Sequence, residues 1–390
     1  MKKLVMGILC AVLLCACSTE KEKDVSKPEK KKDEKIRVSL SITGDNLLED
    51  PLYPWLGSSY DFKDYFDDVK PYLQGDVVIG NQEVLLGGEE LGITGIDYMF
   101  NAPKEIATEM KQVGFDVLTT ANNHSWDRGE EGIIKTLDNL KEEGIATTGV
   151  CKSEEDCRKP LIVERKGVKI AILAYTYDTN QYIEPDKAYM VNKFLNANHE
   201  LDEEHKALLR KDIERAKKEA DVVIAAMHWG TEFTYELNDV QLETANYLNE
   251  LGTDIIIGNH PHCLQTVETL KNEKGHETFV IYSLGNFISS AINVDRATEL
   301  FTNMYEVGGI VNLDIVYDTA SKKVKIENQK MTPFINQFTE GYQNFHLIPF
   351  KDYTEVDAQK HYQRTVSTQF TKKTIEDNLH ELFDGKIEWQ

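Results

Sequence analysis

The stretch Ile255–Cys263, IIIGNHPHC, joins three isoleucines to a Gly-Asn pair and then to two histidines that flank Pro261. A short apolar run that ends in polar residues is typical of a buried strand in a parallel sheet. The chain contains ten histidines in 390 residues, and two of them stand at the end of this single strand. Taken alone, the stretch allows a metal site, a phosphate site, or a turn that contains histidines by coincidence.

Similar apolar runs alternate with helical patterns over most of the chain. Strands are expected at 36–43, 76–80, 115–121, 169–176, 221–228, 253–259 and 278–286. Helices are expected at 61–73, 103–114, 129–144, 203–219 and 239–251, with one or two more within 354–383. Apolar strands that alternate with helices predict an α/β domain rather than an all-β one.

Five of the expected strands end in polar residues. These ends are Gly44-Asp45-Asn46, Gly80-Asn81-Gln82-Glu83, Ala121-Asn122-Asn123-His124, Met227-His228-Trp229-Gly230 and Gly258-Asn259-His260-Pro261-His262. Ligands of α/β sheets bind beyond the carboxyl ends of the strands. We therefore expect the five ends to converge on one site.

The side chains at these ends form a mixed nitrogen and oxygen ligand set. The expected metal ligands are Asp45, Glu83, Asn123, His228, His260 and His262. Such a set suits Mn²⁺, Fe²⁺ or Zn²⁺ and is too rich in nitrogen for Ca²⁺. One or two ions are allowed, because a shared carboxylate can bridge a pair of metals. Both histidines beside Pro261 can face such a centre only if the proline bends the chain.

Each of these residues also has a structural interpretation. Asp45 fits a helix cap or a turn, Glu83 a solvated loop acid, and His228 a packed core histidine. The Ala121–His124 segment fits a turn with left-handed asparagines. The joint occurrence of all five ends, and not any single one, favours a metal or phosphate site.

The composition limits the class of protein. Apolar residues make up 41% of the sequence, which is enough for a substantial core, and the length allows one large domain or two. The formal net charge of −22 argues against nucleic-acid binding, which needs a basic face. The charge does not exclude phosphate substrates, because bound metal ions reverse the local field.

The first residues have the pattern of an export signal. Residues 1–17, MKKLVMGILCAVLLCAC, combine two lysines with a short apolar run that ends at Cys17. Leu14–Cys17 resembles a bacterial lipobox, so we expect Cys17 to carry a lipid that anchors the protein on the extracytoplasmic face of the cell membrane. A cleaved signal without lipid and an uncleaved anchor are the alternatives. Residues 18–35 contain Val25 as their only aliphatic or aromatic side chain, which predicts a disordered charged tether.

Three cysteines remain beyond this region. Cys151 and Cys157 flank the polar loop CKSEEDC and can form a local disulfide in an exported protein or remain two free thiols. Cys263 follows His262 and is expected to be a small buried residue, with metal ligation as the alternative.

The motifs GDN, GNQE, ANNHSWDRG, HWGTE, GNHPH and YSLGNF occur in this order between residues 36 and 290. This set resembles the CapA family of poly-γ-glutamate capsule proteins, which lies within the calcineurin-like metallophosphatase superfamily. The resemblance implies two central β-sheets flanked by helices, an α/β/β/α sandwich. It also implies a metal-dependent hydrolase site in a domain spanning 36–330, with 331–390 expected as a helical extension packed on that domain.

The resemblance also assigns roles to individual residues. Asp45 matches the Asp of the GD motif, and Glu83 stands where the superfamily has a bridging Asp. Asn123 and His228 match single metal ligands, while His260 and His262 match a pair that serves two metals. His124 would lie beside the substrate as the general acid, and Asp127 would orient it.

Three positions depart from the superfamily pattern. No histidine stands two residues after Asp45, Glu83 is one methylene longer than Asp, and Asn259 replaces a histidine that is common in CapA-like chains. The first metal position therefore has fewer strong ligands, which leaves one metal or a weak second metal as alternatives.

Two functions remain open at this point. One is a surface hydrolase of a phosphodiester, a phosphomonoester or an amide in poly-γ-glutamate synthesis or export. The other is a non-catalytic component that binds an acidic polymer or the membrane synthase subunits through the same cleft. Another cell-wall polymer, such as a teichoic acid, is a further candidate substrate.

Overall fold

The protein is described by a computed structural model that covers residues 35–96, 99–292 and 303–390. The expected signal, Cys17 and the expected tether up to residue 34 lie outside these ranges. Among the described residues, no helix combines the length and apolarity that crossing a bilayer requires.

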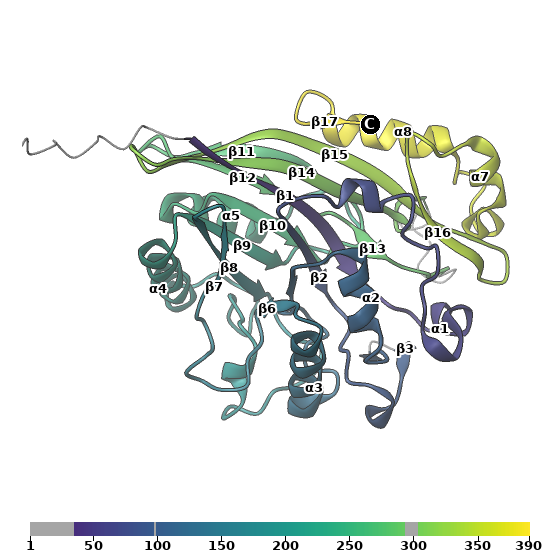
Figure 1. The fold of residues 1–390 in the computed structure, drawn as a ribbon, viewed down its shortest axis with the longest axis horizontal. Helices are drawn as coiled ribbons and strands as arrows, with labels where there is room; N and C mark the ends of the chain where they lie inside the picture. Colours follow the sequence, from purple (N-terminus) through teal and green to yellow (C-terminus); the bar gives the residue numbers. More distant parts are fainter. Residues whose placement is uncertain (1–34, 97–98, 293–302) are drawn as a thin grey trace, which may run out of the picture.

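Two large β-sheets form the centre of the described chain (Figure 1). The larger sheet has the order β16-β15-β14-β1-β2-β5-β6, with two short strands, β13 and β17, attached to β1 and β15. Its strands are β1 (Lys35–Asn46), β2 (Val77–Gln82), β5 (Val117–Thr119), β6 (Ala146–Thr148), β13 (Asn286–Ile288), β14 (Val307–Asp318), β15 (Lys323–Thr339), β16 (Gln343–Pro349) and β17 (Glu388–Trp389). The strands β1, β2, β5 and β6 are parallel.

The smaller sheet has the order β11-β12-β10-β9-β8-β7. Its strands are β7 (Leu161–Arg165), β8 (Val168–Thr176), β9 (Val222–His228), β10 (Ile255–Asn259), β11 (Val267–Lys271) and β12 (Glu277–Ile281). The strands β8, β9, β10 and β12 are parallel, and β7 and β11 pair antiparallel at the two edges. A separate short ribbon pairs β3 (Thr94–Ile96) with β4 (Met99–Asn101).

The side chains of β9 show how the layers form. Val222, Ile224 and Ala226 belong to a core that contains residues of both sheets, so the two sheets pack face to face. The alternate residues Val223 and Ala225 belong to a second cluster on the outer face, together with residues of α4 and α5. This period-two alternation buries both faces of one strand.

Helices cover the outer faces of the two sheets. The smaller sheet is covered by α4 (Glu203–Glu219) and α5 (Asp239–Leu251), and the larger by α1 (Leu52–Leu56), α2 (Ile106–Val113) and α3 (Gly129–Glu142). The layers are therefore α/β/β/α, which confirms the fold class that the sequence predicted. The helices α7 (Glu355–Lys360) and α8 (Lys372–Phe383) follow the last long strand, and Figure 1 shows α8 above β14 and β15.

The helix predicted at 61–73 is wrong. This segment consists of turns and one short 3₁₀ turn at Lys70–Tyr72. The Asp61 carboxylate accepts a hydrogen bond from the Lys63 amide at 2.7 Å, and Lys63 has a φ of +51°, which no α-helix contains. The apolar residues that suggested a helix are nevertheless all buried in one cluster with residues of α1 and α2.

The boundary expected at residue 330 falls inside a strand. β15 runs without a break from Lys323 to Thr339, and β16 adds a further strand up to Pro349. Residues 331–338 are all buried. A strand that is buried on both faces does not need polar residues at every second position, so this stretch lacks the alternating pattern from which a strand is predicted. The helices expected in the C-terminal part begin only at Glu355.

The structure joins Cys151 and Cys157 in a disulfide. Cys263 is a free, buried cysteine, and its thiol donates a hydrogen bond to the Thr234 carbonyl at 3.3 Å. Burial raises the pKa of Cys263 to about 12, so it stays a neutral thiol, which is a poor metal ligand.

Candidate metal centre

The ends of β1, β2, β9 and β10, with the segment after β5, meet at one end of the two sheets. Glu83, His260 and His262 each offer one ligand atom there, and these atoms lie within 4.8 Å of one another. It is the one group of three or more histidine, cysteine or acidic side chains at metal-binding distance in the described ranges. All three residues are buried.

The other expected ligands surround this group of three. His228 Nε2 lies 3.5 Å from Glu83 Oε1, and Asp45 Oδ2 lies 3.9 Å from His262 Nδ1. Asn123 Oδ1 lies 2.7 Å from His228 Nε2. The structure therefore places all six expected ligands in one cluster, although their roles as ligands remain predictions.

The backbone bends sharply at Pro261. His260 has a φ of +102° and His262 a φ of +54°, a region that residues other than glycine rarely adopt and that costs about 1–3 kcal/mol. Two hydrogen bonds hold the bend. The His260 amide donates to Asp45 Oδ2 at 3.0 Å, and the Phe233 amide donates to the Pro261 carbonyl at 2.9 Å. The strain lets both imidazole rings approach Glu83, as expected from the His-Pro-His sequence.

Asp45 is placed by a close approach of two strands. β1 pairs with β13 in parallel, so that Asp45 stands opposite Asn286. A Cβ atom on Gly44 would collide with the carbonyl oxygen of Gly285. Only glycine fits at position 44, which explains the Gly-Asp sequence at the end of β1.

Burial controls the charge of the cluster. Desolvation raises the pKa of Glu83 well above its usual value, and the neighbouring Asp45 carboxylate raises it further. Desolvation also raises the pKa of Asp45 and lowers the pKa values of His228 and His260 far enough to keep both rings neutral. The neutral imidazoles are already in the form that binds metal, whereas the two carboxyl groups would bind it with loss of their protons.

Glu83 provides the test of whether a metal fits. Neither of its carboxylate oxygens accepts a hydrogen bond from any described residue, although both are fully buried. A buried carboxylate without a partner is costly, and a divalent cation held together with His260 and His262 would remove that cost. The donor set of carboxylate oxygen and imidazole nitrogen suits Mn²⁺, Fe²⁺ or Zn²⁺.

His124 and Asp127 form a pair beside the metal ligands. His124 Nδ1 lies 2.7 Å from Asp127 Oδ2, which also accepts a hydrogen bond from the Phe100 amide at 2.6 Å. The Phe100 ring contacts the imidazole edge to face at 4.6 Å. These contacts fix the orientation of the ring, and the side chain of Asn180 lies 3.4 Å from its Nε2 atom.

Sequence reasoning did not single out two asparagines that hold the ligands in place. Asn81 donates a hydrogen bond to Asp45 Oδ1 at 2.7 Å and lies 3.4 Å from His228 Nδ1. Asn286 Oδ1 lies 2.9 Å from His262 Nδ1. Both residues belong to motifs quoted above, GNQE and YSLGNF. The motifs therefore marked the two residues, but they did not show which ligands the residues contact.

We expect Asn286→Ala to weaken metal binding by about 10–100-fold, the usual cost of losing a partner that orients a ligand. The substitution frees the His262 ring to rotate about its side-chain bonds. Titration of the metal-free protein with Mn²⁺ measures the effect. Asn249→Ala is the matched control, because Asn249 is buried and bonds Thr278 on the other side of the molecule. Equal affinities in the two variants would contradict the assignment.

The sequence matches the family model described as bacterial capsule synthesis protein PGA_cap over residues 39–291. This chain belongs to that family. It is 33% identical to the PGA biosynthesis protein CapA of Bacillus subtilis over 186 residues, 47% of this chain and 45% of that protein. It is 28% identical to the capsule biosynthesis protein CapA of Bacillus anthracis over 296 residues, 73% of this chain and 67% of that protein. The chain thus spans about half to two thirds of these relatives.

A solved structure described as a novel phosphatase of Mycoplasma pneumoniae is also similar to this chain. The TM-score is 0.46 and the sequence identity 13%, with 77% of this chain and 95% of that chain covered.

The structure of this PGA_cap member shows what occupies the positions that depart from the pattern expected in the sequence analysis. Leu47 occupies the position two residues after Asp45, and it is buried in the apolar cluster under α1 and α2. Asn259, in the place of a histidine, is buried and its side-chain oxygen accepts no hydrogen bond from the described residues. No imidazole therefore stands at either position, whereas the ligand atoms of Glu83, His260 and His262 lie within 4.8 Å of one another.

Proposed function

We propose that this PGA_cap family member is a surface lipoprotein, anchored through Cys17, that hydrolyses a phosphoester by means of a divalent metal during capsule polymer synthesis or export. The observation that carries the proposal is the unpartnered Glu83 carboxylate between His260 and His262, with the His124–Asp127 pair alongside. The capsule relatives support the process, with poly-γ-glutamate as the polymer.

The residues of the centre would have separate roles in the reaction. Glu83, His260 and His262 would hold the ion, with Asp45, His228 and Asn123 as further donors at the same centre. Such an ion, when bound, lowers the pKa of water and neutralises charge on a phosphoryl oxygen. Asp127 accepts from Nδ1 of His124, which leaves Nε2 as the atom that hands a proton to the leaving oxygen.

The deciding experiment combines metal analysis with a turnover assay. We expect the purified protein to contain a divalent metal and to hydrolyse an aryl phosphodiester in the presence of Mn²⁺. His262→Ala should reduce the metal content and the turnover to background, because it removes one of three clustered ligands. His361→Ala is the matched control. His361 is also buried, but its ring bonds the Asn336 carbonyl in the C-terminal part of the fold.

The enzyme proposal fails if the protein holds no metal, shows no turnover, and keeps its capsule function when His262 is replaced by alanine. Loss of metal and turnover in His262→Ala, in a protein that remains folded by circular dichroism, supports it.

One observation favours a non-catalytic role in which the polymer or the synthase binds the protein away from the metal centre. None of the eight predicted site residues is more than 4% exposed, so a polymer reaches the centre only if the surrounding residues move. If His124→Ala leaves capsule function intact while His262→Ala abolishes it, the metal is structural and this non-catalytic role is correct.

A further inference from the structure

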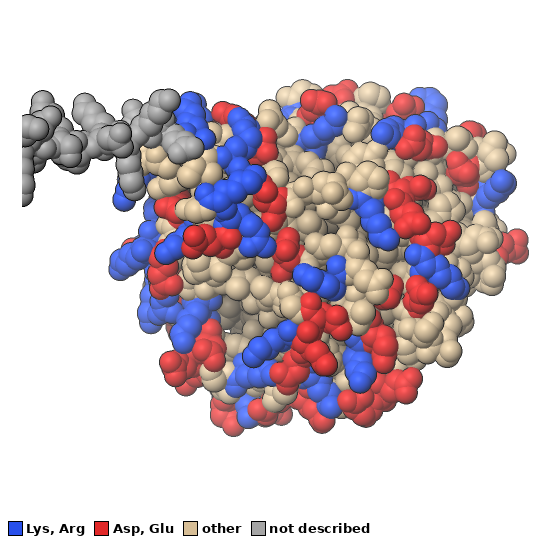
Figure 2. All heavy atoms as spheres, in the orientation of Figure 1, with Lys and Arg blue, Asp and Glu red and all other residues tan. Residues whose placement is uncertain are grey.

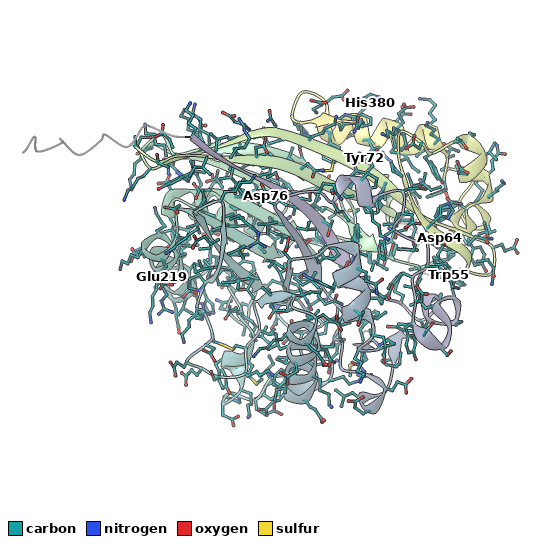
Figure 3. The ribbon with its side chains drawn as sticks, viewed as in Figure 1. Trp55, Asp64, Tyr72, Asp76, Glu219 and His380 are labelled. Atoms are coloured by element: carbon teal, nitrogen blue, oxygen red, sulfur yellow. A yellow bond between two sulfur atoms is a disulfide. The ribbon has the colours of Figure 1, made fainter. Side chains whose placement is uncertain are left out.

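A lysine-rich groove lies at the opposite end of the sheets from the metal centre. Its volume is about 940 Å³. It is lined by the starts of β8 and β9, the last turn of α4 with Glu219 (labelled in Figure 3), and the turn between β14 and β15. We call this feature the basic groove. It contains seven lysines and four acidic residues, in a protein whose formal net charge is −22.

All seven lysines are exposed. Lys217 donates a hydrogen bond to the Leu251 carbonyl at 2.9 Å, and the other six have no carboxylate within ion-pair distance among the described residues. These six are Lys169, Lys218, Lys274, Lys322, Lys323 and Lys325. Elsewhere on the surface, lysines such as Lys135 and Lys206 pair with glutamates at 2.8 Å. The charges of these lysines are therefore not neutralised by the described chain, and their concentration in one groove makes them available to an anionic partner.

The acidic residues of the basic groove are largely occupied. Glu277 pairs with Lys271 at 2.9 Å. Asp254 is buried and accepts a hydrogen bond from the Val223 amide at 2.8 Å, and Asp221 accepts one from the Lys169 amide at 3.0 Å. Glu219 is exposed, but the seven lysines outnumber the four acidic residues, so the net charge of the groove is positive.

The groove lies where the N-terminal segment joins the fold. β1 begins at Lys35, which stands opposite Asp318 at the end of β14. The Lys322 amide donates to the Asp318 carbonyl at 2.8 Å, so the turn that carries Lys322 and Lys323 is adjacent to the start of β1. Figure 2 shows Lys and Arg side chains gathered at this end of the molecule.

We propose that the basic groove docks on the anionic phospholipid headgroups of the membrane to which Cys17 is anchored. The inference rests on the lipid anchor of the proposed function. Seventeen residues lie between Cys17 and Lys35 and span at most about 60 Å when fully extended. An anchor at Cys17 therefore keeps the groove near the bilayer, where each lysine that approaches anionic lipid strengthens binding by roughly fivefold. A soluble polyanion has no comparable reason to meet this end of the molecule.

Docking in this way determines which way the metal centre faces relative to the membrane. Val223 lines the basic groove and His228 lies in the metal centre, at the two ends of β9. His228 follows Val223 by five steps along the strand, which is on the order of 17 Å. The groove would face the headgroups while the centre points away from the membrane, toward material outside the cell.

The test uses the full-length lipidated protein in vesicles. Vesicles of phosphatidylcholine alone are compared with vesicles that contain one third phosphatidylglycerol, and lysines are acetylated and located by mass spectrometry. We expect at least fivefold slower acetylation of the six groove lysines on the anionic vesicles. Lys104 and Lys111, exposed lysines on or beside α2, serve as references that should not change.

Two charge-reversal variants test whether the groove lysines bind the anionic lipid together. K322E/K323E/K325E should remove the protection of Lys169, Lys218 and Lys274, whereas the matched variant K104E/K111E/K141E should leave it intact. Equal acetylation on both kinds of vesicle overturns the proposal. Protection by added poly-γ-glutamate on neutral vesicles, without protection by anionic lipid, also overturns it and assigns the groove to the polymer.

The anchor is tested separately in the same samples. The mass of the N-terminal peptide shows whether Cys17 carries a lipid. An unmodified Cys17 overturns the anchor, and with it the orientation proposed here, whereas a lipidated Cys17 with unprotected lysines overturns the groove alone. Metal content and phosphodiesterase activity do not depend on either outcome.

Discussion

Glu83→Gln is expected to remove the metal from the protein while leaving it folded. Glu83 contributes the one carboxylate of the group formed with His260 and His262. A neutral amide keeps the shape of the side chain but loses the negative charge that attracts the ion. Loss of a residue that merely orients a ligand costs 10–100-fold in affinity. Loss of a ligand should therefore cost at least about 100-fold.

The same substitution should stabilise the metal-free protein near neutral pH. Burial raises the pKa of Glu83 in the folded state, so the folded chain holds a proton that the unfolded chain releases. The stabilisation linked to this proton is complete below about pH 4.3, the pKa of a glutamate in the unfolded chain. It is lost as the pH rises through the higher pKa that Glu83 has in the folded protein. The amide introduced by Glu83→Gln does not titrate and avoids the loss, which is on the order of 1–3 kcal/mol for a buried group without a partner.

Metal analysis and thermal unfolding with and without chelator measure both effects. For the native sequence, chelation should lower the melting temperature at pH 7.5 more than at pH 5. For Glu83→Gln, chelation should change nothing. Glu306→Gln is the matched control, since Glu306 is also fully buried with a raised pKa but lies outside the group of three ligands. A Glu83→Gln protein that retains its metal would disprove the assignment of Glu83 as a ligand.

The convergence of strand ends within each sheet could be predicted from the sequence, because parallel strands place their carboxyl ends at one edge. The meeting of β1, β2 and β5 with β9 and β10 depends in addition on the face-to-face packing of the two sheets. The bend at Pro261 could also be predicted, since His260 and His262 cannot otherwise face one centre. The apolar runs of β9 and β10 predicted buried strands of an α/β domain, and the structure buries both strands on both faces. The α/β/β/α layers, which the structure also shows, were implied by the family resemblance and not by these runs.

Contacts between segments that are distant in the chain could not be predicted. Asn286 faces His262 only because β13 pairs with β1, and no pattern in residues 278–288 specifies that pairing. The helix predicted at 61–73 was wrong for another reason. The apolar spacing of this segment suits a helix, but the Asp61 hydrogen bond and the left-handed Lys63 bury the same side chains on an irregular backbone. Periodicity reports which residues are buried and not how the backbone presents them.

The second large effect concerns His124. His124→Ala should lower the rate of phosphodiester hydrolysis by about 10²–10⁴-fold, the usual contribution of a general acid. Metal content should stay unchanged, because the imidazole lies outside the group of ligands and is held by Asp127 and Phe100. His260→Ala should show the reverse, with the larger loss in metal content. Equal losses of rate and metal in both variants would contradict the division of roles.

The choice of leaving group separates proton donation from a structural role. A nitrophenolate leaves without a proton, whereas an alkoxide needs one, so His124→Ala should slow an alkyl ester more than a nitrophenyl ester by at least tenfold. Asp127→Asn keeps the shape of the pair but removes the charge that supports the protonated ring, and we expect a smaller loss with the same leaving-group dependence. If both esters slow equally in His124→Ala, the ring only supports the site, and the proton must come from water or from another residue of the cluster.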